Sequence, residues 1–269
     1  MLKRYSYIII SCICLMLAAC DYIAEDERLI YDPIMSDVNK DDEQPKLTKR
    51  VVLLEDFTGQ RCSNCPTATN VIEQLQKACG DALVAVAIHG GNQAIFSTSK
   101  VIGLRTPTAD EYYNYWKLQY KPVGLINRQS PIKPDFWATT VKEELAKPAP
   151  LRLDGSAVLA DNAISIQIKA EGTDGTVTGM LQVWLLEDGI KTLQLMPDGT
   201  PNQEYIHNHV FRTAVNGTWG EDISVEEGKT IERSMTQALD PNWNKEQLSI
   251  VAFIYNDSGV QQVTKFKVQ

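Results

Sequence analysis

The sequence is poor in the residues that cross-link small domains or bind metal ions, with six cysteines and three histidines among 269 residues. Three of the cysteines lie within the first twenty residues, which leaves Cys62, Cys65 and Cys79 for the rest of the chain. Three thiols do not make a disulfide-stapled scaffold, and they suggest one close pair and one single cysteine. A zinc site needs four ligands, so we expect no bound metal.

Clusters of basic residues are also missing. Lys and Arg number 26 against 34 Asp and Glu, and the formal net charge is -8. An acidic chain without a basic patch argues against nucleic acid as a partner and against electrostatic docking on anionic lipid. The length predicts one or two domains, and a hydrophobic content of 43% is enough to form cores.

The N-terminus carries an apolar run, residues 7–17, that is too short to span a bilayer as a helix. Two basic residues precede the run, and small residues end it, as in a secretory signal. The sequence Leu17-Ala18-Ala19-Cys20 has the form of a bacterial lipobox, in which the cysteine thiol receives a diacylglyceryl group. We predict that residues 1–19 are a lipoprotein signal peptide and that Cys20 anchors the mature chain through acyl chains.

The next segment, residues 20–48, is polar and acidic, with prolines interleaved. Such a segment cannot bury a core, so we interpret it as a tether. Its cluster Glu25-Asp26-Glu27 follows the lipid cysteine and resembles signals that send Bacteroidetes lipoproteins to the outer cell surface. A solvated linker that carries no address explains the cluster equally well, and both interpretations stay open.

Residues 49–148 alternate strand and helix signals. The patterns predict strands at 51–57, 83–88 and 123–127, and helices at 66–79, 109–118 and 134–147. Pro66 suits the first turn of a helix, and Gly80 is a suitable helix end. Strands that alternate with helices indicate an α/β layer fold with a parallel component.

Residues 149–269 lose most of the helical periodicity, and turn dipeptides that end in glycine recur. Between the turns, strands are predicted at 164–170, 180–186, 209–215, 231–236, 248–255 and 262–268. Several short strands over this length are typical of an all-β sandwich. We therefore predict two folded units that meet near residues 148–150.

The pair Cys62 and Cys65 lies at a predicted strand–loop–helix junction. The unpaired N–H groups and the dipole of a helix N-terminus stabilise a thiolate there. We expect Cys62 to lie at the exposed tip and to attack, with Arg61 adding a positive charge, and Cys65 to resolve the mixed disulfide. A structural disulfide is the alternative. Haem attachment requires a histidine after the second cysteine, where Pro66 stands, so no cofactor is expected.

The stretch Asp56-Phe57, four residues and then Cys62-x-x-Cys65 resembles thioredoxin-like proteins. The resemblance implies that Asp56 is a buried acid that manages the proton on Cys65. It also implies that Pro122 is a cis-proline that faces the dithiol and shapes the groove. The match has departures: Arg61 replaces the usual aromatic residue, residues 90–120 form an insertion, and no edge hairpin is evident before Pro134.

A narrower resemblance covers most of the mature chain. It rests on the lipobox, the acidic tether, Cys-x-x-Cys-Pro and three further motifs, which are Glu55-Asp56-Phe57-Thr58-Gly59, Gly124-Leu125-Ile126-Asn127-Arg128 and Tyr205-Ile206-His207-Asn208-His209-Val210-Phe211-Arg212. These resemble the Bacteroidetes family related to the twenty-eight-kilodalton outer-membrane protein. The resemblance implies an α/β thioredoxin-like domain at 49–148, an all-β immunoglobulin-like sandwich at 149–269, and anchoring in the outer membrane. It implies little about a reaction.

Two functions from different classes remain. The first is thiol-disulfide exchange with exported proteins that contain cysteines. The second is a non-catalytic binding or adhesion protein, whose sandwich contacts a surface ligand such as a peptide or glycan while the thioredoxin-like half is a scaffold. Fold does not decide between them. The remaining candidates are expected to be structural: Cys79 in the core, His89 at a strand end, and His207 with His209 on one face of a strand, where a metal pair is a weak alternative.

Overall fold

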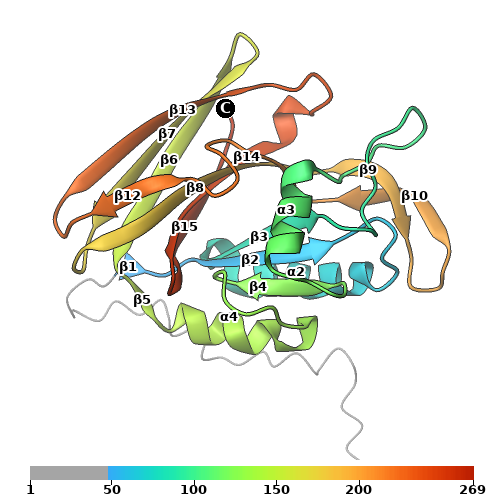
Figure 1. Cartoon of the computed structure of the whole chain (residues 1–269), viewed down its shortest axis with the longest axis horizontal. Coiled ribbons are helices and arrows are strands. Elements are labelled where there is room, and N and C mark those ends of the chain that lie inside the picture. The colour runs from blue at the N-terminus through green and yellow to red at the C-terminus, as the bar shows by residue number, and fades with distance from the viewer. Residues whose placement is uncertain (1–47) are drawn as a thin grey trace, which may run out of the picture. The chain divides into compact units, whose positions relative to one another are not determined.

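The structure is a computed structural model that describes residues 48–269. The predicted signal peptide, the lipidation site Cys20 and nearly all of the acidic tether lie outside the described residues. Within residues 48–269, no helix is both long and apolar enough to cross a membrane. This part of the chain is mostly β-strand, with α-helices packed on one of several sheets (Figure 1).

The first part of the chain alternates strands and helices, which confirms the predicted pattern. The elements are β1 (Thr48–Lys49), β2 (Val52–Thr58), α2 (Cys65–Cys79), β3 (Leu83–His89), α3 (Pro107–Tyr115), β4 (Val123–Ile126), α4 (Trp137–Leu145) and β5 (Pro148–Ala149). Short 3-10 helices lie at Gly80–Ala82 and Pro134–Phe136. β2 is central, parallel to β3 and antiparallel to β4.

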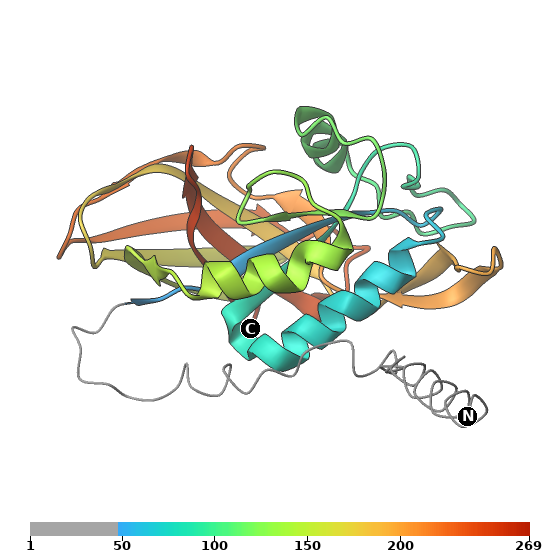
Figure 2. The same ribbon diagram turned by 90° about the horizontal axis from the view of Figure 1, so that it is seen from below.

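Helices cover both faces of these three strands. α2 and α4 pack on one face, where they bury Val52 and Leu54 of β2 (Figure 2). α3 packs on the opposite face, where Leu53 and Phe57 lie in a different cluster. The alternation follows from the two-residue period of a strand, and it is the reason why β2 is buried on both sides.

The second part of the chain is built of strands. They are β6 (Leu151–Ala160), β7 (Ala163–Gly172), β8 (Val177–Glu187), β9 (Ile190–Leu195), β10 (Pro201–His207), β11 (Val210–Ala214), β12 (Glu221–Val225), β13 (Thr230–Ala238), β14 (Leu248–Asn256) and β15 (Gly259–Lys267). A 3-10 helix at Lys245–Gln247 precedes β14. The six predicted strands are confirmed, whereas β6, β9, β10 and β12 were not predicted. The three-stranded sheet β13-β7-β6 packs face to face on β8 and β14 through a shared aliphatic core.

One sheet runs through both parts of the chain. Its order is β15-β14-β8-β11-β3-β2-β4, and β12 pairs with β8 beside it. The junction is narrow, because β11 and β3 pair in parallel at Val210 and Ala87. The predicted boundary at residues 148–150 therefore separates the part with alternating strands and helices from the part built of strands. Both parts contribute strands to the same sheet. The β9–β10 hairpin is a separate two-stranded sheet, and it lies to the right of β3 and α2 in Figure 1.

Candidate active site around Cys62 and Cys65

Cys62 and Cys65 form a disulfide between β2 and α2, with their Cα atoms 5.4 Å apart. Cys65 is the first residue of α2, and Pro66 follows it in the first turn, as the sequence predicts. The loop turns tightly, because the backbone N–H of Cys62 donates to the carbonyl of Gly59 at 2.9 Å. Asn64 precedes α2, and its side chain makes no capping hydrogen bond to the helix. The positive end of the α2 dipole therefore faces the dithiol loop.

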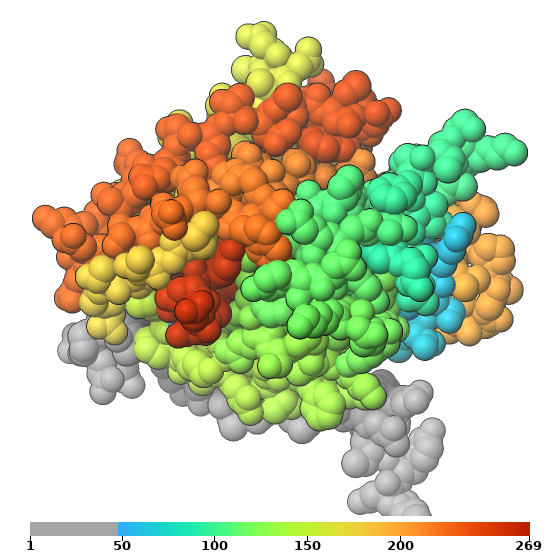
Figure 3. Space-filling model, in the orientation of Figure 1, coloured from blue at the N-terminus to red at the C-terminus, as the bar shows by residue number. Residues whose placement is uncertain are grey.

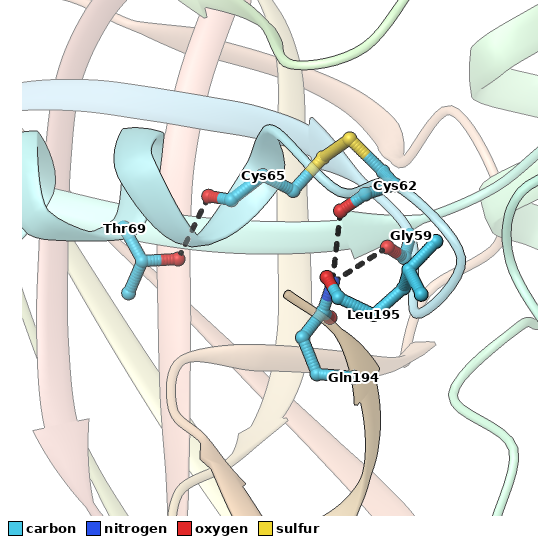
Figure 4. Close-up of a disulfide and its surroundings, with 6 residues drawn as sticks. All are labelled: Gly59, Cys62, Cys65, Thr69, Gln194 and Leu195. Carbon is cyan, nitrogen blue, oxygen red and sulfur yellow. Dashed lines mark hydrogen bonds between the residues drawn. A yellow bond between two sulfur atoms is a disulfide. The ribbon is translucent and has the colours of Figure 1, made fainter. Parts of the chain in front are cut away.

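Both cysteines are almost completely covered, since Cys62 is 2% exposed and Cys65 is 1% exposed. The prediction that Cys62 lies at an exposed helix tip is therefore wrong. The β9–β10 hairpin, far along the chain, contacts the loop from one side (Figure 4). The side-chain Nε2 of Gln194 in β9 donates to the carbonyl of Cys62 at 2.9 Å and to the carbonyl of Gly59 at 3.4 Å.

Gln60 holds the same loop from within. Its buried Nε2 donates to the carbonyls of Ile102 at 3.0 Å and Leu193 at 3.3 Å. Its Oε1 accepts the backbone N–H of Leu104 at 3.0 Å, and its own carbonyl accepts the N–H of Leu195 at 2.8 Å. The dithiol loop is thus tied both to the segment before α3 and to the hairpin, which explains the burial of the sulfur atoms.

Asp56 lies in β2 on the face that α2 covers. Val52 and Leu54, four and two residues earlier, lie on the same face. Its side chain is buried, and its Oδ1 has no hydrogen-bond partner in the part of the chain that the structure describes. Burial raises the pKa of Asp56 to about 7, although the positive charge of Lys121 acts in the opposite direction. A carboxyl group in this state exchanges protons near neutral pH.

The Lys121–Pro122 peptide bond is cis, as the resemblance implies. Pro122 comes directly before β4, whose Val123 pairs with Phe57 near the end of β2. Pro122 therefore lies at the end of the sheet from which the dithiol loop leaves. Lys121 is buried beside it, with its Nζ 4.2 Å from the centre of the Tyr113 ring, and burial lowers the pKa of Lys121 to about 8.

The structure separates the two histidines that were predicted to share a strand face, so this prediction is wrong. β10 ends at His207, whereas His209 follows with a φ of +57° and pairs with Asp188 at 3.0 Å. His207 packs instead against His89 at 5.4 Å between ring centroids, with Tyr205 at 4.8 Å. Burial lowers the pKa of His207 to about 4 and that of His89 well below its usual value. Within residues 48–269, no three His, Cys, Asp or Glu side chains gather as a metal site.

Cys79, which was predicted to lie in the core, and Arg61, which was predicted to lie beside Cys62, have separate positions. Cys79 ends α2 and packs half-buried against the cluster under α2 and α4, and burial raises the pKa of its thiol. Arg61 has an exposed side chain, and its backbone N–H donates to the carbonyl of Gln93 at 2.9 Å. The loop that carries the dithiol is thus also bonded to the segment after β3.

Glu55 and Arg128 form a polar pair on the opposite face of β2, which sequence analysis did not identify. Glu55 is fully buried, and burial raises its pKa to about 7 against the effect of Arg128. The guanidinium of Arg128 lies over five aromatic rings. The distances to the ring centres are 4.3 Å for Tyr255, 4.8 Å for Phe253, 5.2 Å for Trp184, 5.6 Å for Tyr112 and 5.9 Å for Trp219.

Solved structures show what this fold is similar to. HBP35 of Porphyromonas gingivalis superimposes with a TM-score of 0.67 at 14% identity, over 82% of this chain and 76% of that chain. A protein from Agrobacterium tumefaciens has a TM-score of 0.51 at 15% identity, over 82% of this chain and 96% of that chain. Identities this low show a common fold and nothing about activity. A domain of the outer membrane lipoprotein Omp28 from Porphyromonas gingivalis is 29% identical over 45% of this chain and 89% of that chain, with a TM-score of 0.33.

A family comparison covers more of the chain than any single motif. None of the curated proteins compared with the chain matches it. The family model described as Outer membrane protein Omp28 matches residues 109–269, which is more than half of the chain. The matched region begins in α3, after the dithiol, and includes Arg128 and the predicted motif at residues 205–212. The match confirms the family that the motifs indicated: the chain belongs to the Omp28 family of outer membrane proteins.

Proposed function

We propose that the chain is an envelope-anchored lipoprotein whose thioredoxin-like part exchanges disulfides with exported proteins that contain cysteines. The observation that carries the proposal is the Cys62–Cys65 disulfide at the positive end of α2, on the face of the sheet where Asp56 is buried. A helix N-terminus lowers the pKa of a thiol, which makes it a better leaving group and raises the fraction that is present as the reactive thiolate. A buried carboxyl group on the face of the sheet that α2 covers supplies a proton acceptor that ordinary structural disulfides do not need.

Exchange begins when a thiolate of the partner protein attacks Sγ of Cys62. A bond forms between the partner's sulfur and Cys62, the Cys62–Cys65 bond breaks, and Cys65 leaves as a thiolate that takes up a proton. A second thiolate of the partner then attacks the partner's sulfur in the mixed disulfide and releases Cys62. The partner loses two electrons and gains a disulfide. The chain gains the two electrons, and its own disulfide becomes two thiols. The same steps in reverse reduce a disulfide of the partner.

Asp56 is assigned the proton transfer in this sequence. Its pKa of about 7 means that the protonated and ionised forms are both populated near neutral pH. The protonated form can give its proton to the departing thiolate of Cys65, and the ionised form can take it back when Cys65 attacks. Pro122 is assigned a different role, which is to shape the surface that the partner's chain contacts beside Cys62.

The order of the elements supports this assignment of the first half, residues 49–148. The strand order β3-β2-β4, α2 and α4 on one face, and a cis peptide before β4 are what a thioredoxin-like domain requires. Gly124 and Ile132 form an isolated antiparallel bridge where the edge hairpin was expected. For the second half, residues 149–269, two packed sheets support an immunoglobulin-like sandwich.

The proposed location rests on the family and on the N-terminus. The family description names an outer membrane protein. The lipobox adds an anchor, because acyl chains on Cys20 hold a folded domain at a membrane without a spanning helix. In this proposal residues 1–19 are the signal peptide and residues 20–48 are the tether. The acidic cluster in the tether directs the protein to the cell surface if it acts as an address.

Trapping tests the proposal. In a Cys65→Ser variant of the full chain, Cys62 can attack but nothing resolves the product, so mixed disulfides with partner proteins should accumulate. Cells are quenched in acid, free thiols are alkylated, and complexes are compared on non-reducing gels and by mass spectrometry. Cys79→Ser is the matched control and should trap nothing. If Cys65→Ser traps no more than the Cys62→Ser/Cys65→Ser double variant, the exchange function is wrong.

A second function is favoured by the burial of both cysteines, which are 2% and 1% exposed. A disulfide covered by the β9–β10 hairpin suits a non-catalytic surface binding or adhesion lipoprotein, in which the sandwich makes the contact. The two functions differ in the chemistry of the dithiol. A reduction potential far below those of cellular reductants, with no alkylation of the native protein, would assign the disulfide a structural role.

A further inference from the structure

A pocket of about 1070 Å³, which the dithiol does not line, lies between the end of α3, the loop after β4, β8 and the β14–β15 turn. On the face shown in Figure 3, the red atoms of the β14–β15 turn lie between the yellow atoms of β8 and the green atoms of the segment that follows α3. Aromatic rings and small polar side chains share the lining. We name it the aromatic pocket, and its rings are Tyr115, Trp116, Trp219 and Tyr255.

Three of the four rings, those of Trp116, Trp219 and Tyr255, offer faces rather than hydrogen-bond donors. The hydroxyl of Tyr255 donates to the carbonyl of Trp219 at 2.8 Å, and Nε1 of Trp219 donates to Oε1 of Glu111 at 3.2 Å. Nε1 of Trp116 is itself buried. Tyr115 is 61% exposed and packs against Trp219, with ring centroids 4.5 Å apart. A ligand therefore meets fixed π-faces, whose partial negative charge attracts C–H groups.

The polar part of the lining is exposed and held in place. Gln129, Ser130, Asp257 and Ser258 are exposed lining residues, which together present hydroxyl, amide and carboxylate groups. The turn that carries the last two is fastened to the first half of the chain, because the N–H of Val260 donates to the carbonyl of Asn127 at 2.9 Å. Such a preformed site loses little conformational entropy when it binds a ligand.

The charges exclude anionic ligands. Arg128 contributes to the lining but is only 6% exposed, faces Glu55 and lies against the Tyr255 ring, so its guanidinium is not free to meet an anion. Asp257 adds an exposed carboxylate, and the chain as a whole has a formal charge of -8. Nucleotides, phosphorylated peptides and anionic lipids need uncompensated Lys or Arg in such a site. The ligand should therefore be neutral.

The choice between a peptide and a saccharide depends on the hydrogen-bond donors that the aromatic side chains of the pocket offer. Aromatic grooves that bind proline-rich peptides combine ring faces with polar groups for the peptide carbonyls. Here the Tyr255 hydroxyl and the Trp219 indole N–H are already bonded within the protein. Sugars need less from the rings, because their C–H faces stack on them. Their hydroxyls donate to the Asp257 carboxylate, and they both donate to and accept from Ser258, Gln129 and Ser130.

We propose that the aromatic pocket binds a neutral oligosaccharide. The sugar rings stack on Tyr115 and its neighbouring aromatic faces, and their hydroxyls bond to the exposed polar side chains. The volume of about 1070 Å³ is slightly above the roughly 300–1,000 Å³ of small-molecule sites, which suits several linked sugars better than one. The proposal is independent of the dithiol, which does not line the pocket.

The test uses the detergent-solubilised full chain and four neutral hexasaccharides, built from α-1,4-glucose, β-1,4-glucose, β-1,4-mannose and β-1,4-linked N-acetylglucosamine. Titration calorimetry and tryptophan fluorescence should show saturable binding of at least one, with a Kd between about 10 μM and 1 mM. Tyr115→Ala should weaken that binding at least tenfold, and Asp257→Asn several-fold. Tyr120→Ala is the matched control, because Tyr120 is 45% exposed and outside the lining.

Each other result overturns the proposal. It is wrong if none of the four hexasaccharides binds at about 10 mM, or if Tyr115→Ala binds as tightly as the unmodified chain with the same melting temperature. It is also wrong if a proline-rich decapeptide binds and Tyr115→Ala abolishes that binding, which would assign the pocket to peptides. Cys62→Ser should bind the saccharide as the unmodified chain does, and a loss there would move the site away from the pocket.

Discussion

Glu55 and Arg128 form an ion pair inside the shared core, with Oε1 and Nε 3.5 Å apart and both side chains at most 3% exposed. Glu55 belongs to β2, whereas most of the rings around Arg128 belong to the second half of the chain. The pair therefore joins the two halves at the point where the aromatic residues meet. Arg128 has a φ of +58°, which the surrounding contacts hold in place.

Removal of the cation alone should strongly destabilise the protein. Arg128→Met leaves the carboxyl of Glu55 buried without its partner, and we expect a loss of about 3–5 kcal/mol in the free energy of unfolding. The double variant Glu55→Gln/Arg128→Met should recover part of the loss. Urea unfolding at pH 8 measures both. Arg152→Met, which removes an exposed pair with Glu171, is the control and should cost less than about 1 kcal/mol.

Asp56 should make stability fall as the pH rises. Its pKa is about 7 in the folded chain against 3.8 when unperturbed, so the folded state binds the proton more tightly. The resulting stabilisation is complete below pH 3.8 and is lost as the pH rises through about 7. Asp56→Asn should raise the free energy of unfolding at pH 8 by up to about 4 kcal/mol and leave it little changed near pH 4.

The measurement for Asp56 is urea unfolding at several pH values between 4 and 8. Asp222→Asn, at an exposed position in β12, is the matched control and should leave the pH profile unchanged. Glu55 has a raised pKa as well, so a smaller slope of the same sign should remain in Asp56→Asn. An unchanged slope in Asp56→Asn would contradict the burial argument.

Gln194 should control access to the disulfide. Gln194→Ala removes the donor that bonds to the carbonyls of Cys62 and Gly59, so the hairpin should open more often. We expect the native disulfide to be reduced by dithiothreitol roughly tenfold faster, which corresponds to the loss of one or two hydrogen bonds. Quenched samples are alkylated and followed by mass. Gln203→Ala, at an exposed position on β10 of the same hairpin, should react at the original rate, and equal rates for both variants would exclude a gating role.

Cys62 should be the attacking thiol of the reduced protein. It precedes α2 on the side of the positive helix end, so its pKa should lie below the roughly 8.5 of an unperturbed thiol. Alkylation at a series of pH values, with mass mapping of the peptides, should modify Cys62 first and at lower pH than Cys65. Arg61→Ala should raise the apparent pKa of Cys62, because it removes a positive charge nearby, and Arg152→Ala should not. Preferential modification of Cys65 would reverse the assignment.

Lipidation of Cys20 is the prediction that concerns the N-terminus. Metabolic labelling with palmitate should mark the unmodified chain, because the lipobox places a thiol where the diacylglyceryl group is attached. Cys20→Ala should remain unlabelled and should leave the membrane fraction, whereas Cys12→Ala is the control and should be labelled normally. Equal labelling of Cys20→Ala would remove the anchor from the proposal.

Local patterns determined much of the architecture. Strand and helix periods placed β2, α2, β3, α3, β4 and α4, since each depends on side chains only a few residues apart. The predicted turn dipeptides also hold, for example at Gly189, where a φ of +72° requires the freedom of glycine. The cysteine pair at a strand–helix junction and the family motifs are equally local, and they identified the candidate site and the family.

Tertiary structure alone decided the state of that site. The side chain of Gln194 donates a hydrogen bond to the carbonyl of Cys62, which lies 132 positions earlier in the sequence. The ring of His207 packs against His89, and His209 lies apart from both. Burial depends on which distant segments return to cover a residue, and no pattern within one segment encodes that return. The exposure of Cys62 was therefore predicted wrongly, while its place before a helix was predicted correctly. The aromatic rings around Arg128 meet for the same reason: only the closed fold brings together residues from both halves of the chain.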